Sequence, residues 1–252
     1  MRIIGFLIFV SIYFAFSGNS MAGDSSLGLP AAIKGAKYVG TDTCASCHEK
    51  QYKEFKLSTH ARISPKDVPE GIPTGCEMCH GPGSVHVDNG GGKGSIINPS
   101  KNPEACFVCH KDKKMVFRLP YHHPVLEGKM GCVDCHDAHA VDIRPWAVAS
   151  ERDVNDVCFK CHTDKRGPFI WQHDALREGC SVCHQVHGSV NAKMLIARDV
   201  NLCLRCHATV NFPVMGGPGG DNHTMHIPYG TCWSAGCHQA VHGSNMSNHL
   251  NY

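Results

Sequence analysis

The 252-residue sequence is poor in the residues that usually build a protein interior. Leucine, isoleucine, valine and phenylalanine are sparse, whereas glycine occurs 26 times and proline 14 times. A chain of this length could form one domain or two by burying apolar side chains, but this composition cannot supply a conventional core. Something other than the polypeptide must therefore contribute the apolar interior.

Several sequence signatures of common enzymes are also missing. No Rossmann, P-loop or nucleophile-elbow pattern occurs in the sequence. Nucleotide-dependent chemistry and serine-hydrolase chemistry therefore receive no support.

Long apolar runs are confined to the N-terminus, where Ile3–Phe16 follows Arg2 and precedes the small-x-small site Ser20-Met21-Ala22. This pattern predicts a secretory signal peptide over residues 1–22. An uncleaved membrane anchor is the alternative, but the run is short for a bilayer. No cysteine lies near the cleavage point, so lipid anchoring is not indicated. We expect export to the periplasm of a Gram-negative cell, with residues 23–252 as the mature chain.

The 16 cysteines form eight pairs, and a histidine directly follows the second cysteine of every pair. Seven pairs have the spacing CxxCH, and the eighth is stretched to CxxxxCH. The pairs with their histidines are Cys44/Cys47/His48, Cys76/Cys79/His80, Cys106/Cys109/His110, Cys132/Cys135/His136, Cys158/Cys161/His162, Cys180/Cys183/His184, Cys203/Cys206/His207 and Cys232/Cys237/His238.

The CxxCH spacing is typical of c-type haem attachment. On one helical turn both thiols and the imidazole share a face, so the thiols can join one haem while the histidine binds its iron. Structural zinc sites and disulfides are the alternatives, but neither needs a histidine directly after each pair. We therefore predict eight covalently bound haem c groups. Their propionates would make the loaded protein acidic despite a formal net charge of +2, which disfavours a nucleic-acid partner.

The motifs alternate between two kinds, which indicates an internal repeat. One kind is followed by a polar or charged run, and the other has a glycine just before it and another histidine soon after. This alternation predicts an octahaem domain over residues 23–252, built of four two-haem modules at about 40–100, 101–150, 151–197 and 198–252. The expected fold is that of a multihaem cytochrome c: short helices and loops wrapped around a stacked haem chain, with little or no sheet. We expect a helix over Glu49–Ala61 and loops over Val87–Pro99 and Phe212–Asn222.

The remaining histidines recur at equivalent places in the modules and are candidates for the sixth iron ligand. Upstream of the second motifs lie His60, His122 or His123, His173, and His223 or His226; downstream lie His86, His139, His187 and His242. One from each group gives eight ligands, and His249 is left over. His139 and His187 follow their motif histidines too closely to reach the far face of the same haem, so we expect them to bind a neighbour's iron.

Three strings, "CEMCHGPGSVHV", "HHPVLEGKMGCVDCHDAHA" and "CHQAVHGSN", resemble the DmsE/MtrA type of periplasmic multihaem c-type cytochrome. With eight motifs the chain is similar to the octahaem OmaB-like members of porin-cytochrome conduits. The resemblance implies a cytochrome that sits in an outer-membrane β-barrel porin and passes electrons from periplasmic cytochrome donors to an outer-surface multihaem cytochrome. It also implies a place in the periplasm, associated with the outer membrane.

The resemblance further implies that His123 rather than His122 is a sixth ligand, together with His86 and His242. The complete predicted set of sixth ligands is His60, His86, His123, His139, His173, His187, His223 and His242, with His226 open as the alternative to His223. The stretched motif departs from the pattern, but Ser234, Ala235 and Gly236 are small enough to bulge out, so we expect a haem there as well.

An iron with two histidine ligands has no open position, which suits electron transfer rather than substrate chemistry. The predicted function is therefore an electron relay and not an enzyme. A multihaem reductase would need a five-coordinate haem, often marked by CxxCK or a tyrosine crosslink, and neither mark is visible. A polymerising filament commonly borrows a histidine from the next subunit, whereas this chain has a surplus. A soluble periplasmic shuttle, or an electron-donor subunit of a terminal reductase, makes similar demands on the sequence and stays open.

Overall fold

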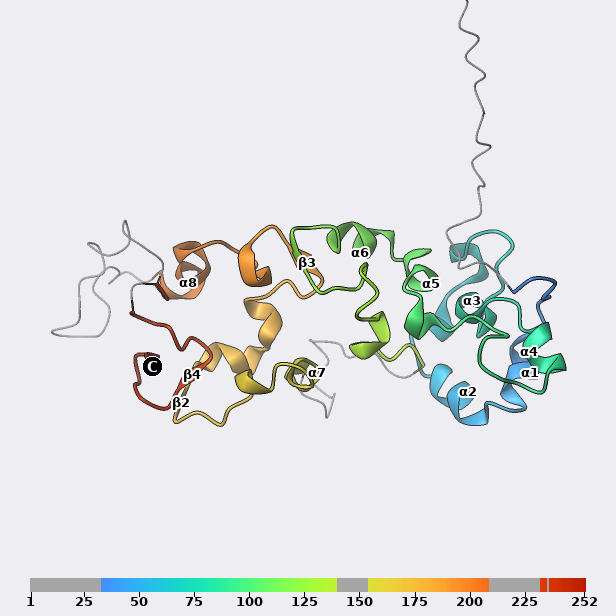
Figure 1. The fold of residues 1–252 in the computed structure, drawn as a ribbon, viewed down its shortest axis with the longest axis horizontal. Coiled ribbons are helices and arrows are strands. Elements are labelled where there is room, and N and C mark those ends of the chain that lie inside the picture. The colour runs from blue at the N-terminus through green and yellow to red at the C-terminus, as the bar shows by residue number, and fades with distance from the viewer. Residues whose placement is uncertain (1–32, 140–153, 209–231, 235) are drawn as a thin grey trace, which may run out of the picture.

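The structure is a computed structural model that describes residues 33–139, 154–208, 232–234 and 236–252. The predicted signal peptide, the expected loop at Phe212–Asn222, and His223 and His226 lie outside these residues. The molecule is elongated, with the N-terminal helices at one end and the C-terminus at the other, and between them residues 188–189 double back to lie beside Val116 (Figure 1). Successive motifs are therefore laid out along the molecule.

All helices in the described residues are short. The α-helices are α1 (Thr41–Ala45), α2 (Glu49–Phe55), α3 (Glu77–His80), α4 (Ser84–Asp88), α5 (Glu104–Phe107), α6 (Lys111–Val116), α7 (Val154–Phe159) and α8 (Val200–His207). Single turns of 3-10 helix cover His60–Arg62, Pro65–Asp67, Pro99–Lys101, Cys132–Asp134, Thr163–Lys165, Asp174–Glu178, Cys180–Val182 and Ala192–Met194. The strands are β1 (Tyr121–His122), β2 (Trp171–Gln172), β3 (Gly188–Ser189) and β4 (Gly243–Ser244). The predicted fold class, short helices and loops with little sheet, is confirmed.

The helix expected over Glu49–Ala61 is wrong in length. Helix α2 ends at Phe55, and a separate 3-10 turn follows at His60–Arg62. Ser58 is buried between them, and its hydroxyl accepts a hydrogen bond from the Ala61 N–H at 3.2 Å. Serine side chains offer the backbone such local partners, which compete with a continuous helix. The expected loop at Val87–Pro99 is observed, except that α4 extends to Asp88.

Two short antiparallel ladders join segments far apart in the sequence. In the first, β1 pairs with β3, with His122 opposite Gly188; in the second, β2 pairs with β4, with Gln172 opposite Gly243. Both ladders pair an aromatic-x-His segment with a Val-His-Gly-Ser segment. We call them the strand joints. They fasten the second predicted module to the third, and the third to the fourth.

Each strand joint depends on a glycine that lets two chain segments approach closely. A Cβ at Gly188 would overlap the backbone oxygen of Val116, and a Cβ at Gly243 would overlap the ring of Phe169. The glycine after each histidine is therefore required by the packing of the joint.

The apolar core is small. Phe107, Phe117 and Val125 form a cluster of buried side chains, with Met130 and Cys132 packed against it. This agrees with the expectation that side chains alone do not build a conventional interior. Within the described residues, no helix is both long enough and apolar enough to span a membrane.

Candidate functional site

Each regular motif closes through a backbone hydrogen bond between its first and last residues. In the first motif the His48 N–H donates to the Cys44 carbonyl at 2.9 Å, and in the sixth the His184 N–H donates to that of Cys180 at 3.0 Å. This is the bond of one helical turn, and it brings both thiols and the imidazole to one side. The sites are numbered 1 to 8 by their motif histidines: His48, His80, His110, His136, His162, His184, His207 and His238.

The stretched motif of site 8 makes the same closing bond. The His238 N–H donates to the Cys232 carbonyl at 2.9 Å, although two more residues lie between the cysteines than in CxxCH. Gly236 takes a positive φ of 81°, a conformation that glycine adopts without strain. The first cysteine therefore keeps its place relative to the histidine despite the longer spacing.

Seven motif histidines each face one other histidine ring. The pairs are His48 with His86, His80 with His139, His110 with His60, His136 with His187, His162 with His123, His184 with His242, and His207 with His173. Every second member is a histidine that the sequence analysis chose as a sixth ligand.

The spacing of these pairs fits a metal ion between the rings. All seven centroid distances lie between 6.0 and 6.2 Å, although the angle between the ring planes varies from 3° to 85°. Rings in direct contact would change their spacing with their tilt. Two metal–imidazole bonds of about 2 Å each account for about 4 Å at any tilt, and the rest is the distance from each nitrogen to its ring centre. The residues present therefore fit a haem iron with two histidine ligands.

Hydrogen bonds from Nδ1 to backbone carbonyls orient several of these rings and leave Nε2 for a metal. Nδ1 of His80 donates to the Ile97 carbonyl at 3.0 Å, and Nδ1 of His184 donates to that of Lys193 at 2.9 Å. Among the histidines that face the motif histidines, Nδ1 of His123 donates to the Val186 carbonyl at 2.7 Å. His173 and Val241 repeat this last contact at 3.1 Å. A carbonyl bound to Nδ1 fixes the tautomer in which Nε2 is the metal ligand.

Burial keeps several of these histidines neutral, which metal binding requires. Burial, and after it the charge of Lys165, lowers the pKa of His242 to about 4. Burial is likewise the main cause that lowers the pKa values of His80, His187 and His207.

The structure distinguishes His123 from its neighbour His122. Both ring nitrogens of His122 are engaged with protein: Nδ1 bonds the Leu119 carbonyl at 2.5 Å, and Nε2 pairs with Glu127 at 2.9 Å. His123 instead faces the ring of His162. The leftover His249 is exposed, and its backbone carbonyl accepts a bond from Nδ1 of His238 at 2.6 Å.

Six of the seven facing pairs join histidines of different predicted modules. His60, His123 and His173 each face the first motif histidine of the following module, and His139, His187 and His242 each face the second motif histidine of the preceding module. The expectation for His139 and His187 matches this placement. The sequence analysis missed that the upstream histidines cross as well, because sequence distance does not reveal which module lies nearest. Only the His48–His86 pair lies within one module.

Thiols of successive sites are neighbours. Burial, and after it nearby Cys76 of site 2, raises the pKa of Cys44 to about 11. A hydrogen bond between Cys106 of site 3 and Cys132 of site 4 raises the pKa of the first and lowers that of the second to about 7. Burial raises the pKa of Cys203 to about 12, with a contribution from Cys232.

The same succession holds at the other steps along the chain. Three more pairs of thiols are neighbours: Cys79 with Cys109, Cys135 with Cys158, and Cys183 with Cys206. In each pair burial is the main cause that raises the pKa of the first thiol, and the second thiol is the next largest cause. Sites 5 and 6 are linked through Asn155 of α7, whose Oδ1 accepts bonds from the N–H of Cys180 at 2.8 Å and from its Sγ at 3.0 Å. The attachment points therefore follow the order of the sequence from site 1 to site 8.

Two predicted attachment cysteines, Cys47 of site 1 and Cys161 of site 5, are not the main link between their own site and a neighbouring one. Both are exposed, whereas the first cysteines of the same motifs, Cys44 and Cys158, are half-buried and provide that link. The Sγ of Cys47 accepts a weak hydrogen bond from the hydroxyl of the adjacent Ser46 at 3.8 Å. Sequence spacing does not show which thiol of a motif lies nearer to the next site.

The backbone at these two positions nevertheless has the regular motif geometry. The N–H groups of Cys47 and Cys161 donate to the carbonyls of Cys44 and Cys158, both at 3.2 Å. Each thiol thus keeps its place on the turn beside the motif histidine. Haem attachment at Cys47 and Cys161 stays a prediction that rests on the turn and on the CxxCH spacing.

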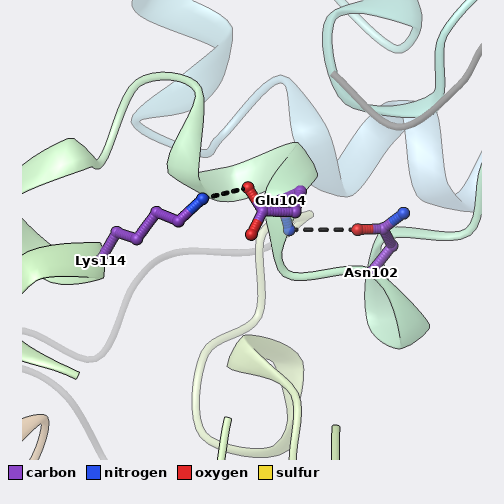
Figure 2. Close-up of polar contacts among 3 residues, drawn as sticks. All are labelled: Asn102, Glu104 and Lys114. Atoms are coloured by element: carbon purple, nitrogen blue, oxygen red, sulfur yellow. Dashed lines mark hydrogen bonds and ion pairs between the residues drawn. The ribbon is translucent and has the colours of Figure 1, made fainter. Parts of the chain in front are cut away.

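A polar brace holds the helices on either side of the site 3 motif. Asn102 accepts a bond from the Glu104 N–H at the start of α5, and the Glu104 carboxylate pairs with Lys114 of α6 at 2.7 Å (Figure 2). Asp156 and Arg166 occupy the equivalent positions around site 5, at 3.7 Å. In both braces the acidic residue lies two positions before the first cysteine of the motif, and the basic residue lies four positions after the motif histidine.

No disulfide joins the 16 cysteines, all of which lie in the described part of the chain. In the same residues, no three His, Cys, Asp or Glu side chains form a metal-binding group. The metal-compatible arrangements in these segments are thus the histidine pairs.

Known proteins share this organisation. The family described as the doubled CXXCH motif matches residues 122–167 and 173–212. The chain is 31% identical to the multiheme cytochrome MtrA of Shewanella baltica over 82% of its own length and 79% of that protein. It is 38% identical to the cytochrome c-type protein NrfB of Haemophilus influenzae over 23% of its length and 28% of that protein.

The relation to MtrA extends over most of both chains, and the doubled motif covers sites 4 to 7 together with parts of the joints described above. Covalent attachment of haem c to the CxxCH motifs, and electron transport through those haems, follow from this relation. The chain belongs to the MtrA family of multihaem cytochromes.

Proposed function

We propose that the protein binds eight haem c groups and relays electrons along them in sequence order, as part of a conduit across the outer membrane. The observation that carries the relay is the constant spacing of seven histidine pairs at every tilt. A bound haem supplies a one-electron ferric/ferrous couple. The two cysteines of each motif would hold a haem, and two histidines would bind its iron and so keep substrates away from it.

The proposed ligand pairs at sites 1 to 7 are the seven ring pairs described above. At site 8, His238 takes its partner from His223 or His226. These two histidines are the candidates that the sequence offers for the fourth module, upstream of its second motif. The closing bond of the stretched motif supports a haem at this site.

The position of the thiols supports a single line of haems. Neighbouring cysteines link almost every successive pair of sites, and Asn155 links the remaining pair. An elongated molecule with its sites in chain order is suited to carry electrons from one end to the other (Figure 1).

The relation to MtrA supports a place in the periplasm at the outer membrane, inside a β-barrel porin, with periplasmic cytochrome donors and an outer-surface multihaem cytochrome as acceptor. A barrel would exclude water from the haem chain and complete the membrane crossing. The signal peptide predicted over residues 1–22 is consistent with this location.

The haem count is tested by the intact mass of the mature protein. We expect the mass of the processed chain plus eight haems, and a low-spin spectrum for all of them. A mass corresponding to seven haems, with Cys232 and Cys237 unmodified, would reject a haem at site 8. Peptide mapping that finds Cys47 or Cys161 unmodified would reject attachment through two cysteines at site 1 or site 5.

The conduit is tested with the porin and this cytochrome in liposomes that enclose a reduced dye. External ferric citrate should oxidise the dye when both proteins are present and should not when either is missing. If the pair moves no electrons, and the protein stays in the osmotic-shock fluid of cells that make the porin, a soluble shuttle replaces the conduit.

A further inference from the structure

Glu77 is a buried carboxylate within the motif of site 2, directly after Cys76. Its residue is only 2% exposed. Three backbone groups donate hydrogen bonds to it. Oε1 accepts from Val39 at 3.0 Å and from Gly83 at 2.9 Å, and Oε2 accepts from Gly40 at 2.8 Å and from Val39 at 3.2 Å. These bonds hold the N-terminal segment and the turn after His80 against the motif.

The arrangement suits a negatively charged carboxylate. Every partner of the two oxygens is an N–H donor, and a protonated carboxyl would direct its own hydrogen against them. None of the ion pairs formed by the described residues involves Glu77. The buried charge is therefore compensated by backbone N–H groups rather than by a cation.

The carboxylate lies between two proposed haem sites. It belongs to the motif that ends in His80, and it also acts on a thiol of site 1. After burial and Cys76, the charge of Glu77 is a further cause that raises the pKa of Cys44. A charge that influences a sulfur of site 1 from within the motif of site 2 is close to the haems of both.

We propose that Glu77 is an electrostatic tuning residue that lowers the reduction potentials of sites 1 and 2. Reduction adds one electron to a ferric iron and gives a ferrous iron with one positive charge fewer. A nearby fixed anion interacts more favourably with the ferric state, and low solvent access strengthens this interaction. Because the proposal rests on haems being bound at sites 1 and 2, it deepens the proposed relay.

The consequence for the relay is a bias along its length. A haem with a lowered potential gives up its electron to the rest of the chain, so electrons that arrive at sites 1 and 2 move toward the interior. A merely structural role for Glu77 as a clasp for the N-terminal segment would produce no such bias.

The test is a potentiometric titration of the full-length, haem-loaded protein, followed by optical and electron paramagnetic resonance spectra. Glu77→Gln should shift two of the haem potentials, those of sites 1 and 2, upward, while intact mass and low-spin spectra remain those of the wild type. Glu49→Gln is the matched control: Glu49 directly follows His48 but its side chain is 73% exposed and pairs with Lys53, so its removal should leave the titration curve unchanged.

A second variant keeps the carboxylate and all its hydrogen bonds. Val39 and Glu77 both flank Gly83, so Val39→Lys places a cation beside the charge and should raise the same two potentials. If the Glu77→Gln protein does not bind its haems, the titration of Val39→Lys tests the proposal instead. A loaded, low-spin variant of either kind with the wild-type titration curve overturns the proposal. Missing haems or high-spin iron in the wild type would instead reject the ligand pairs on which it rests.

Discussion

The first haem site and the interior sites are built in different ways. At site 1 both rings, those of His48 and His86, come from the same predicted module, and His86 is oriented by the Gly92 carbonyl and the Ser95 hydroxyl close to it in the sequence. At sites 2 to 7 the two rings come from neighbouring modules, and strand joints at two of the three module boundaries hold them. A local site can be completed by one module, whereas an interior site cannot. The exchange of ligands makes the modules parts of one unit.

The largest expected difference between the two kinds of site appears when a sixth ligand is removed. His187→Gly should convert site 4 to high spin and destabilise the chain by about 3 kcal/mol, because it also removes a residue next to a strand joint. His86→Gly should convert site 1 to high spin with a smaller loss of stability. Electron paramagnetic resonance and the midpoint of thermal unfolding check both. His249→Gly is the control, and equal destabilisation by the first two variants would contradict the comparison.

The joint itself can be tested without changing any ligand. Gly188→Val should destabilise the protein by about 2 kcal/mol, because the new Cβ overlaps the Val116 carbonyl oxygen. The matched change in the first module is Gly90→Ala, where a Cβ meets open space but φ is 68°, and we expect a cost of about 1 kcal/mol. Thermal unfolding measures both variants. A larger effect of the second would show that the strand joint is not a point of close packing.

A spectroscopic comparison separates two adjacent histidines at the same joint. His123→Asn should produce one high-spin haem at site 5, whereas His122→Asn should leave all haems low-spin, because both nitrogens of His122 already bond Leu119 and Glu127. The spin state of each purified variant gives the answer. A high-spin signal in the His122 variant alone would reverse the assignment.

The smallest expected effect concerns the brace at site 3. Lys114→Met removes a half-buried ion pair with Glu104 and should cost about 0.5 to 1 kcal/mol, with a weaker effect at high salt. In the first module, Lys53→Met removes an exposed pair with Glu49 along α2 and should cost less. A double-mutant cycle with Glu104→Gln measures the pair, and zero coupling energy would mean that the brace does not hold the motif.

The sequence was sufficient for the features that repeat and insufficient for those that depend on spatial neighbours. The motif spacing predicted the histidine-bearing turns, and the recurrence of further histidines predicted every facing ring that the described residues contain. The stretched motif also closes as expected from its small residues. The rings that His60, His123 and His173 face could not be derived from the sequence, because they depend on how one module packs on the following one. The strand joints were missed because strands of two residues carry no alternating pattern. Helix α2 was overestimated because Ser58 forms a local turn.

Ligand exchange between modules also imposes an order on maturation. A chain that crosses the inner membrane with its N-terminus first presents His80 well before His139, and His136 well before His187. The second sites of the first three modules would therefore lack their second histidine until the following module has emerged. Site 1 would need no later module, because His48 and His86 both belong to the first module. The sites would therefore be completed one after another, and as the chain emerges one haem site at a time would still lack its second histidine.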